Sequence, residues 1–225
     1  MQIKLLHHFC FVNLQHQEYI MTEPELPSNL LEQAVNEMSR LPGIGRKTAL
    51  RLILHLLREE KKDALKLGES LTKLVNDIHY CKVCHNITEN EVCDICADNA
   101  RDHKTICVVE DIRDLLAIEN TQQYRGVYHV LGGIISPIDG VGPGDLTIDL
   151  LMQRLENSSV DEIIFALPTT MEGDTTNYYL HKQIAGRVDK ITTLARGLSF
   201  GDELQYADEV TLGRSLVERI DYQTS

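Results

Sequence analysis

The chain has 225 residues, of which 43% are hydrophobic and 25% are charged, and its formal net charge is −12. This composition can build the core of one large or two small globular domains, and the excess of acids argues against a surface that binds nucleic acid everywhere. Polar residues interrupt the most apolar stretch well short of the roughly 18 to 20 residues that a membrane helix needs, so we expect no membrane partner.

Residues 1–20 lack the charged head, apolar core and cleavage site of a signal peptide. A second methionine, Met21, precedes a polar segment that leads to a helix with Ser28 as N-cap and Glu32 in its first turn. We hypothesise that Met21 is the native start and that residues 1–20 are an upstream read-through. Residues 1–27 are then a disordered N-terminal extension of a cytoplasmic protein.

Positive charge is concentrated in one segment of the chain. Residues 40–66 contain eight lysines and arginines against three acids, whereas residues 145–175 contain seven acids against a single base, Arg154. Such segregation can give an acidic protein a local basic surface for nucleic acid. Two ordinary solvated faces would give the same pattern, so charge alone leaves both interpretations open.

The segment that carries this charge is predicted to be a helix, a tight turn and a second helix. Apolar residues recur at helical spacing before and after the turn Pro42-Gly43-Ile44-Gly45. We expect both glycines to adopt positive φ and to bring the backbone close to another molecule, while the second helix points its first N–H groups outward. Lys47 and Arg51, four residues apart, share one face of that helix. These groups suit phosphate oxygens and do not read bases.

The stretch Leu41-Pro-Gly-Ile-Gly45, with the basic residues and Ala49 that follow, resembles the helix-hairpin-helix motif, which binds DNA backbones independently of sequence. The competing interpretation is a turn that only joins two packed helices. The resemblance favours contact with single- and double-stranded DNA through Gly43, Gly45, Arg46, Lys47 and Arg51.

Two cysteine pairs, Cys81-x-x-Cys84 and Cys93-x-x-Cys96, follow the hairpin. Each short turn directs two thiolates at one centre, so the pairs together supply the four sulfurs of a tetrahedral zinc site. Four protein ligands fill the coordination shell, and the predicted zinc, one per chain, is therefore structural. Disulfides are the alternative, but the chain has no secretory segment and no framework for pairing its other two cysteines.

After the cysteines, apolar β-branched runs alternate with helical stretches. We predict strands over 105–109, 127–131 and 163–167 and helices around 111–118 and 148–155. Buried strands separated by helices indicate parallel βαβ units around a central parallel sheet.

Carboxylates follow two of these strands. Glu110 comes after the first predicted strand, and Glu172-Gly173-Asp174 is expected in the loop after the third. Because the carboxyl ends of parallel strands meet at one edge of the sheet, Glu110, Glu172 and Asp174 are expected to lie together there. They would form either a Mg²⁺ site or a surface that binds a partner.

A glutamate at a strand end with a later acid-x-acid pair resembles the Toprim fold of primases and type IA topoisomerases. Hairpin, four-cysteine zinc finger and Toprim in this order resemble the RecR family of bacterial recombination mediators, from about residue 30 to 220. Many members of that family have proline where this chain has Arg46, whose extra charge should strengthen phosphate contact. Further matching stretches are Val130-Leu-Gly-Gly133, Ser136-Pro-Ile-Asp-Gly140, and Tyr206-Ala-Asp-Glu-Val-Thr-Leu212.

The resemblance implies a non-enzymatic, nucleoid-associated DNA repair protein whose subunits assemble into a ring-like clamp, either tetramer or dimer. With RecO, RecF or both, this clamp would promote loading of RecA onto gapped single-stranded DNA. The family's DNA contacts fall on Lys47 and Arg51, and its partner-binding Toprim face includes the loop with Glu172. The alternative is a Toprim-type metal-dependent nuclease, in which metals held by carboxylates activate water.

The expected fold class is therefore a multi-element α/β protein. After the N-terminal extension it has a helix-hairpin-helix region, a four-cysteine zinc finger, a Toprim domain with a central parallel sheet, and a C-terminal oligomerisation segment. Their expected bounds are 1–27, 28–79, 80–102, 103–195 and 196–225.

Overall fold

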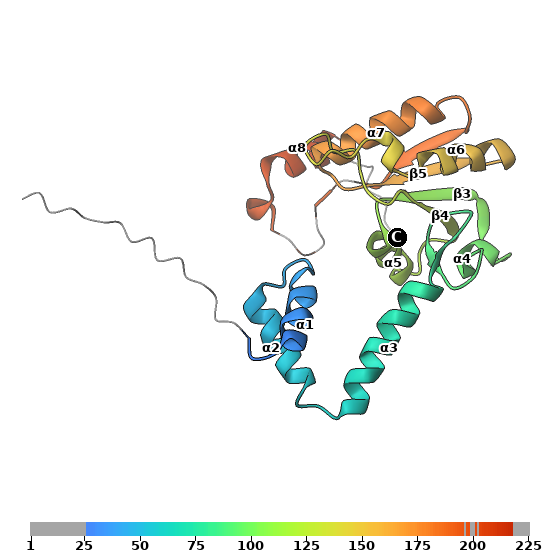
Figure 1. Cartoon of the computed structure of the whole chain (residues 1–225). Helices are drawn as coiled ribbons and strands as arrows, with labels where there is room; N and C mark the ends of the chain where they lie inside the picture. The colour runs from blue at the N-terminus through green and yellow to red at the C-terminus, as the bar shows by residue number, and fades with distance from the viewer. Residues whose placement is uncertain (1–25, 196, 199–200, 202, 218–225) are drawn as a thin grey trace, which may run out of the picture. The chain divides into compact units, whose positions relative to one another are not determined.

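The computed structural model describes residues 26–195, 197–198, 201 and 203–217 of the chain (Figure 1). The chain divides into two compact units between Leu71 and Thr72. The hypothesised start at Met21 lies outside the described residues, as do most of the expected extension 1–27 and the end of the expected C-terminal segment.

The first unit contains the helical hairpin that the sequence predicts. α1 (Asn29–Ser39) and α2 (Arg46–Leu56) pack against each other, and their fully buried residues are Val35 and Ala49. A small side chain such as that of Ala49 lets two helices approach closely. The next helix, α3 (Lys61–Asp77), crosses the division between the units and buries none of its residues.

The second unit begins with a small cysteine knuckle. β1 (His79–Tyr80) and β2 (Ile87–Thr88) pair in an antiparallel sheet on either side of the first cysteine pair. The short helix α4 (Asp94–Ala97) begins directly after Cys93, the first cysteine of the second pair, and Cys93 is its N-cap. The knuckle encloses a small buried cluster of sulfurs, to which Cys81, Cys84 and Cys93 belong.

Four parallel strands form the central sheet in the order β4–β3–β5–β6. The three predicted strands are confirmed, and the fourth, β6, was not predicted. β6 is a short strand at the edge of the sheet, none of its residues is buried, and its sequence Lys-Ile-Thr-Thr has only one strongly apolar residue. The strands are β3 (Asp102–Val109), β4 (Gly126–Val130), β5 (Glu162–Ala166) and β6 (Lys190–Thr193).

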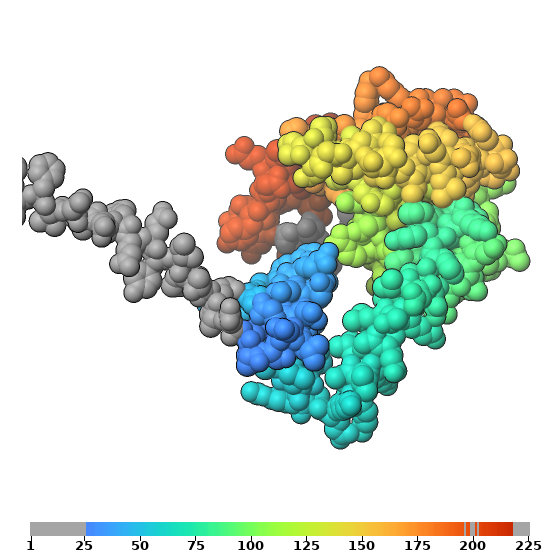
Figure 2. All heavy atoms as spheres, viewed as in Figure 1, coloured from blue at the N-terminus to red at the C-terminus, as the bar shows by residue number. Residues whose placement is uncertain are grey.

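Helices cover both faces of this sheet (Figure 1). α6 (Ile148–Asn157) and α7 (Met171–Ile184) pack on the face that carries Ile106 and Val108. α5 (Ile112–Asn120) packs on the opposite face. In Figure 2 the atoms of α6 and α7, coloured yellow to orange, form a layer at the top of the view. The two predicted helices around 111–118 and 148–155 are thereby confirmed.

Short helical elements complete the described chain. A 3-10 turn, η1 (Pro143–Asp145), lies in the long connection from β4 to α6. After β6 follow a second 3-10 turn, η2 (Leu204–Tyr206), and a final helix, α8 (Glu209–Val217). No residue of η2 or α8 is buried.

Candidate nucleic-acid interface and zinc site

The hairpin turn exposes its backbone through two glycines in different conformations. Gly43 has a φ of +77°, as predicted, whereas Gly45 has a φ of −78° and a ψ of 161°. The expectation of positive φ at both glycines is thus wrong for Gly45, because this residue is the N-cap of α2 and N-caps adopt extended backbone. A Cβ at either position would meet no atom within 4 Å. Another molecule can therefore approach the turn closely.

The N-terminus of α2 adds hydrogen-bond donors to this turn. The N–H of Ala49 donates the first helical bond, to the carbonyl oxygen of Gly45 at 2.9 Å. The N–H groups of Lys47 and Thr48 precede that bond and have no acceptor one helical turn earlier. Donors of this kind, at the positive end of the helix dipole, favour an anion such as phosphate.

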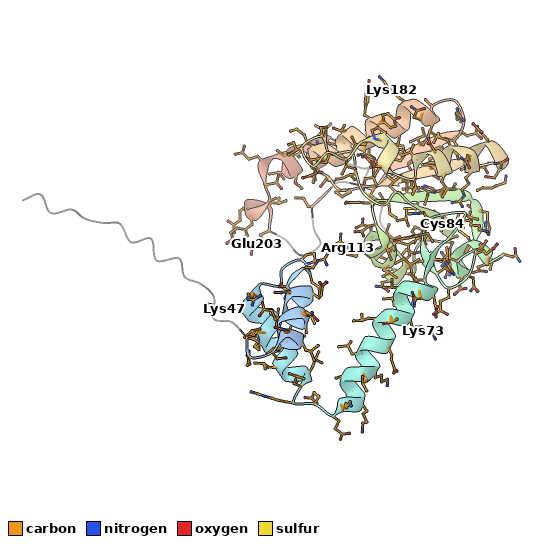
Figure 3. All side chains as sticks on the ribbon, viewed as in Figure 1. Lys47, Lys73, Cys84, Arg113, Lys182 and Glu203 are labelled. Atoms are coloured by element: carbon orange, nitrogen blue, oxygen red, sulfur yellow. The ribbon has the colours of Figure 1, made fainter. Side chains whose placement is uncertain are left out.

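A row of cations runs along one face of α2 and into the turn that follows it. Lys47, Arg51 and Arg58 are all exposed, and none of them forms an ion pair with a carboxylate in the described part of the chain. Figure 3 labels Lys47 on this unit. A shallow groove along the helix, of about 530 Å³, is lined by Lys47, Leu50, Arg51, Leu52, Leu54, His55 and Arg58.

Arg58 and His55 extend the interface beyond the predicted residues. The signal in the sequence was the continued helical spacing, since positions 47, 51, 55 and 58 fall on one face of a helix. His55 lies 3.6 Å from the carboxylate of Glu59, one turn further along.

The side chain of Arg46 forms bonds within the hairpin. Its guanidinium donates to Oδ1 of Asn36 at 2.6 Å and to Oε1 of Glu32 at 2.5 Å, and both partners belong to α1. Arg46 therefore braces the two helices of the hairpin, and its expected contact with phosphate stays a prediction.

The four predicted cysteines converge in the knuckle, where Figure 3 labels Cys84. Their Sγ atoms all lie within 4.8 Å of one another, and those of Cys84 and Cys93 are 3.5 Å apart. A tetrahedral zinc ion with Zn–S bonds of about 2.3 Å would place its sulfurs about 3.8 Å apart. The Sγ of Cys81 also accepts hydrogen bonds from the N–H groups of Val83 and Cys93. The residues present therefore fit zinc.

Without a bound cation, the hydrogen bonds among these sulfurs move their pKa values apart. The hydrogen bond between Cys84 and Cys93 raises the pKa of Cys84 and lowers the pKa of Cys93. Four adjacent sulfurs become thiolates together only when a cation offsets their repulsion. Bound zinc would supply that charge and link the strands of the knuckle, with no open coordination position for chemistry.

The predicted carboxylate site is only partly assembled. Glu110 follows β3 as expected, but Glu172 and Asp174 lie in the first turn of α7 and not in a loop. The helix starts early because the hydroxyl of Thr170 accepts a hydrogen bond from the N–H of Gly173 at 3.1 Å. Among the described residues, the cysteines are the one group whose ligating atoms gather closely enough for a metal. Mg²⁺ at the carboxylates is therefore not supported.

Glu110 nevertheless stands in an acidic environment. Partial burial raises its pKa, and the nearby carboxylates of Asp114 and Asp111 raise it further. Gly173, between the other two acids, is required by packing, because a Cβ there would lie 1.9 Å from the carbonyl oxygen of Pro168. Close contact between α7 and Pro168, in the segment after β5, thus fixes the positions of Glu172 and Asp174.

Comparisons with known proteins agree with the order of these parts. Family models match for the RecR helix-hairpin-helix over residues 31–75, the RecR four-cysteine zinc finger domain over 78–98, the Toprim domain over 104–195, and the RecR C-terminal region over 197–220. Fold and cysteine site together define a Toprim protein with an N-terminal helix-hairpin-helix and a four-cysteine zinc finger.

Curated relatives identify the family. Proteins named recombination protein RecR from Flavobacterium johnsoniae and Bacteroides thetaiotaomicron are each 58% identical to this chain, over 88% and 87% of it and 97% and 95% of their own lengths. The RecR of Porphyromonas gingivalis is 54% identical over 88% of this chain and 96% of its own. The chain belongs to the RecR family of recombination proteins, which confirms the predicted resemblance. Each helix among the described residues is too short or too polar to span a bilayer.

Proposed function

We propose that this protein is a non-enzymatic mediator of recombinational DNA repair that grips the backbone of single- and double-stranded DNA with its hairpin. The observation that carries the proposal is the row of exposed cations on α2, beside a turn whose backbone is open to a ligand. From Lys47 to His55 the row extends about 12 Å at the rise of an α-helix, and Arg58 follows in the turn after α2, so the row can contact more than one phosphate. Phosphate contacts of this kind carry no sequence information.

The proposal includes assembly into a ring-like clamp, dimeric or tetrameric. Large apolar side chains are exposed on the hairpin and on the part of α3 that belongs to the same unit, including Leu30 at 78%, Leu57 at 70% and Leu65 at 55%. Such exposure on neighbouring helices is typical of surfaces that subunits cover. Several hairpins on one clamp would add their weak contacts by raising the effective concentration of each.

Within the cell, the clamp would act in the cytoplasm at the nucleoid and promote loading of RecA on gapped single strands, together with RecO, RecF or both. We assign partner binding to the Toprim face that carries Glu110, Glu172 and Asp174. The acidic environment of Glu110 suits a basic partner, and a partner surface needs no metal. Structural zinc, one ion per chain, would keep the knuckle folded.

We propose that the parts of the chain keep the bounds expected from the sequence. These are an extension over 1–27, the hairpin region over 28–79, the zinc finger over 80–102, the Toprim domain over 103–195 and an oligomerisation segment over 196–225.

The test is DNA binding by the variant Lys47→Glu with Arg51→Glu. Loss of two phosphate contacts on single-stranded DNA should weaken binding about 25-fold at 0.1 M salt and lower the slope of log K against log salt by about 1.4. The matched control is Lys66→Glu with Lys73→Glu, which changes the net charge equally from exposed positions on α3. An unchanged salt slope in the α2 variant would show that the hairpin is not part of the interface. Equal losses of DNA affinity in both variants would show that the effect comes from net charge alone.

Non-enzymatic action has its own test. Incubation of zinc-loaded protein with Mg²⁺ and labelled single- and double-stranded DNA should leave the DNA intact. Cleavage that disappears on Glu110→Gln would overturn this part of the proposal in favour of a Toprim-type nuclease.

A further inference from the structure

A second cationic groove lies in the other unit, between the zinc knuckle and α6. It has a volume of about 360 Å³ and belongs wholly to the unit that starts at Thr72. No acid is among its lining residues, although the chain carries a net charge of −12. The groove is lined by Lys82, Val83, His103, Leu150, Gln153, Arg154, Asn157 and Ser158.

Arg154 supplies a fixed positive charge at this groove. Its Nη1 donates to the carbonyl oxygen of Tyr128 at 2.8 Å, so the half-buried guanidinium is anchored on β4. In the described part of the chain it forms no ion pair with a carboxylate. Arg154 is also the single base among the seven acids of residues 145–175. An anchored guanidinium with remaining N–H donors is a preferred partner for phosphate.

Lys82 supplies the second charge, from within the first cysteine pair. Its backbone N–H donates to the carbonyl oxygen of Glu91, so the folded knuckle fixes the position of the residue. The side chain forms an ion pair with Glu91 at 3.0 Å, with 67% and 80% of the two side chains exposed. An ion pair this exposed contributes little and exchanges readily. A phosphate in the groove can therefore compete for Lys82.

The ring of His103 also lines the groove and lies 2.9 Å from the carbonyl oxygen of Asp98, and the other lining side chains are amide, hydroxyl or apolar groups. Asn157 donates to the carbonyl oxygen of Gln153 at 2.7 Å, and the hydroxyl of Ser158 donates to that of Arg154 at 2.7 Å. These two bonds order the end of α6 beside the cations. Val83 and Leu150 add apolar surface against which a sugar ring can pack.

We propose that this groove binds the sugar-phosphate backbone of single-stranded DNA, as a contact separate from the hairpin. The proposal rests on the DNA binding proposed above but uses residues of the zinc knuckle and α6. Its two cations sit among amide, hydroxyl and apolar groups, which matches a phosphate with its attached sugar. A flexible single strand can enter a recess of this size more easily than a stiff duplex.

An acidic protein segment is the less favoured occupant. The usual way for a peptide to bind at a sheet is to add a strand at its edge. Here the outer edge of β4 is already engaged, because the carbonyl oxygen of Cys84 accepts from the N–H of Val130 and Arg154 donates to Tyr128. A peptide would find side-chain charges but no free backbone partners there.

The first test is Lys82→Gln, with Lys104→Gln as a matched control. Lys104 is on the strand that carries His103 but does not line the groove, and it forms a similarly exposed ion pair with Asp161. Fluorescence anisotropy with a labelled oligothymidine should give about fivefold weaker binding for Lys82→Gln at 0.1 M salt. The salt slope should fall by about 0.7, as expected for one lost phosphate contact on a single strand. Lys104→Gln should bind like the wild type.

A second variant keeps the test valid if Lys82→Gln disturbs the metal site, which zinc content per chain will reveal. Gln153→Glu places a carboxylate in the groove without touching a cysteine or Tyr128, and Gln123→Glu adds the same charge at an exposed loop position. Binding should weaken for Gln153→Glu only. Equal affinities for these two variants would overturn the proposal.

The hairpin variant separates this inference from the proposed function. If Lys47→Glu with Arg51→Glu loses binding while Lys82→Gln and Gln153→Glu do not, the hairpin proposal stands and the groove proposal fails. If no variant loses binding, both fail. A glutamate-rich peptide that binds the wild type but not Lys82→Gln, with oligothymidine binding unchanged, would reassign the groove to an acidic protein segment.

Discussion

Arg101 and Glu119 form a two-bonded ion pair that joins the end of the zinc knuckle to α5. Nη1 and Nη2 of the arginine donate to the two carboxylate oxygens at 2.9 and 2.5 Å, and both side chains are largely buried. The same carboxylate accepts from the hydroxyl of Tyr128, and Nη1 also reaches the carbonyl oxygen of Gly126. One glutamate thus connects the knuckle, α5 and β4.

Because of this pair, we expect the free energy of unfolding to depend on pH. The hydrogen bond from Arg101 holds the pKa of Glu119 below its ordinary value of 4.5. The contribution is therefore present at pH values above 4.5 and is lost as pH falls through the lower pKa of the folded state. Glu119→Gln should lower the free energy of unfolding at pH 7 by roughly 1.5–3 kcal/mol, the range for hydrogen bonds to charged groups.

Urea unfolding from pH 7 down to pH 3 measures this effect. The difference between wild type and Glu119→Gln should shrink as the solution becomes acidic. Glu156→Gln is the control, because its ion pair with Arg187 is exposed and should contribute little at any pH. A difference that stays constant across the range would show that the carboxylate charge of Glu119 is not what stabilises the unit.

Zinc removal should destabilise the Toprim sheet as well as the knuckle. The carbonyl oxygen of Cys84 accepts a 2.8 Å hydrogen bond from the N–H of Val130, so the metal site and the edge strand β4 are directly linked. Cys93→Ser should lose its zinc and several kcal/mol of unfolding free energy, because structural metal binding is coupled to folding. Cys107→Ala, a buried cysteine outside the cluster, should retain one zinc per chain.

Metal content and thermal unfolding with and without a chelator give the readout. Cys107→Ala should lose stability through its packing alone, and the chelator should lower its melting temperature as it does that of the wild type. A Cys93→Ser protein with full zinc content would contradict the four-sulfur site.

Arg46→Ala should affect the hairpin more than DNA. Its guanidinium bonds to Asn36 and Glu32 on α1, so its loss removes two contacts between the helices. We expect the free energy of unfolding to fall by about 1–3 kcal/mol, while the salt slope of DNA binding changes by less than in Arg51→Ala. Denaturant unfolding and anisotropy titrations on both variants make the comparison. A slope reduced equally in the two would return Arg46 to the DNA contact.

Glu172→Lys should abolish association with RecO and leave DNA binding intact or improved. The side chain lies in the first turn of α7 together with Asp174, where a reversed charge would repel a basic partner. Glu209→Lys, at the start of α8, changes the charge equally and serves as the control. Pull-down and DNA titration of the same preparations are the measurements. Unchanged RecO association would move the partner surface elsewhere.

Local spacing made several parts of the protein predictable from its residues. Cys-x-x-Cys turns direct two sulfurs to one point wherever they fold, so the convergence of Cys81, Cys84, Cys93 and Cys96 followed without a structure. The same applies to the hairpin, whose apolar period and glycine turn are properties of one short segment. The buried strands were equally evident, because burial on both faces requires uninterrupted apolar runs.

Side-chain partnerships between distant segments were decided only by the tertiary structure. Whether Arg46 bonds to α1 depends on how closely the two helices pack. The residues of the turn motif alone do not predict its ion pair with Glu32. Glu172 and Asp174 were expected in a loop after the third strand, but the cap at Thr170 places them in the first turn of α7. The groove between Lys82 and Arg154 joins residues far apart in the chain. Backbone geometry acts over a few residues and can be read locally, whereas side-chain pairing depends on which elements the core brings together.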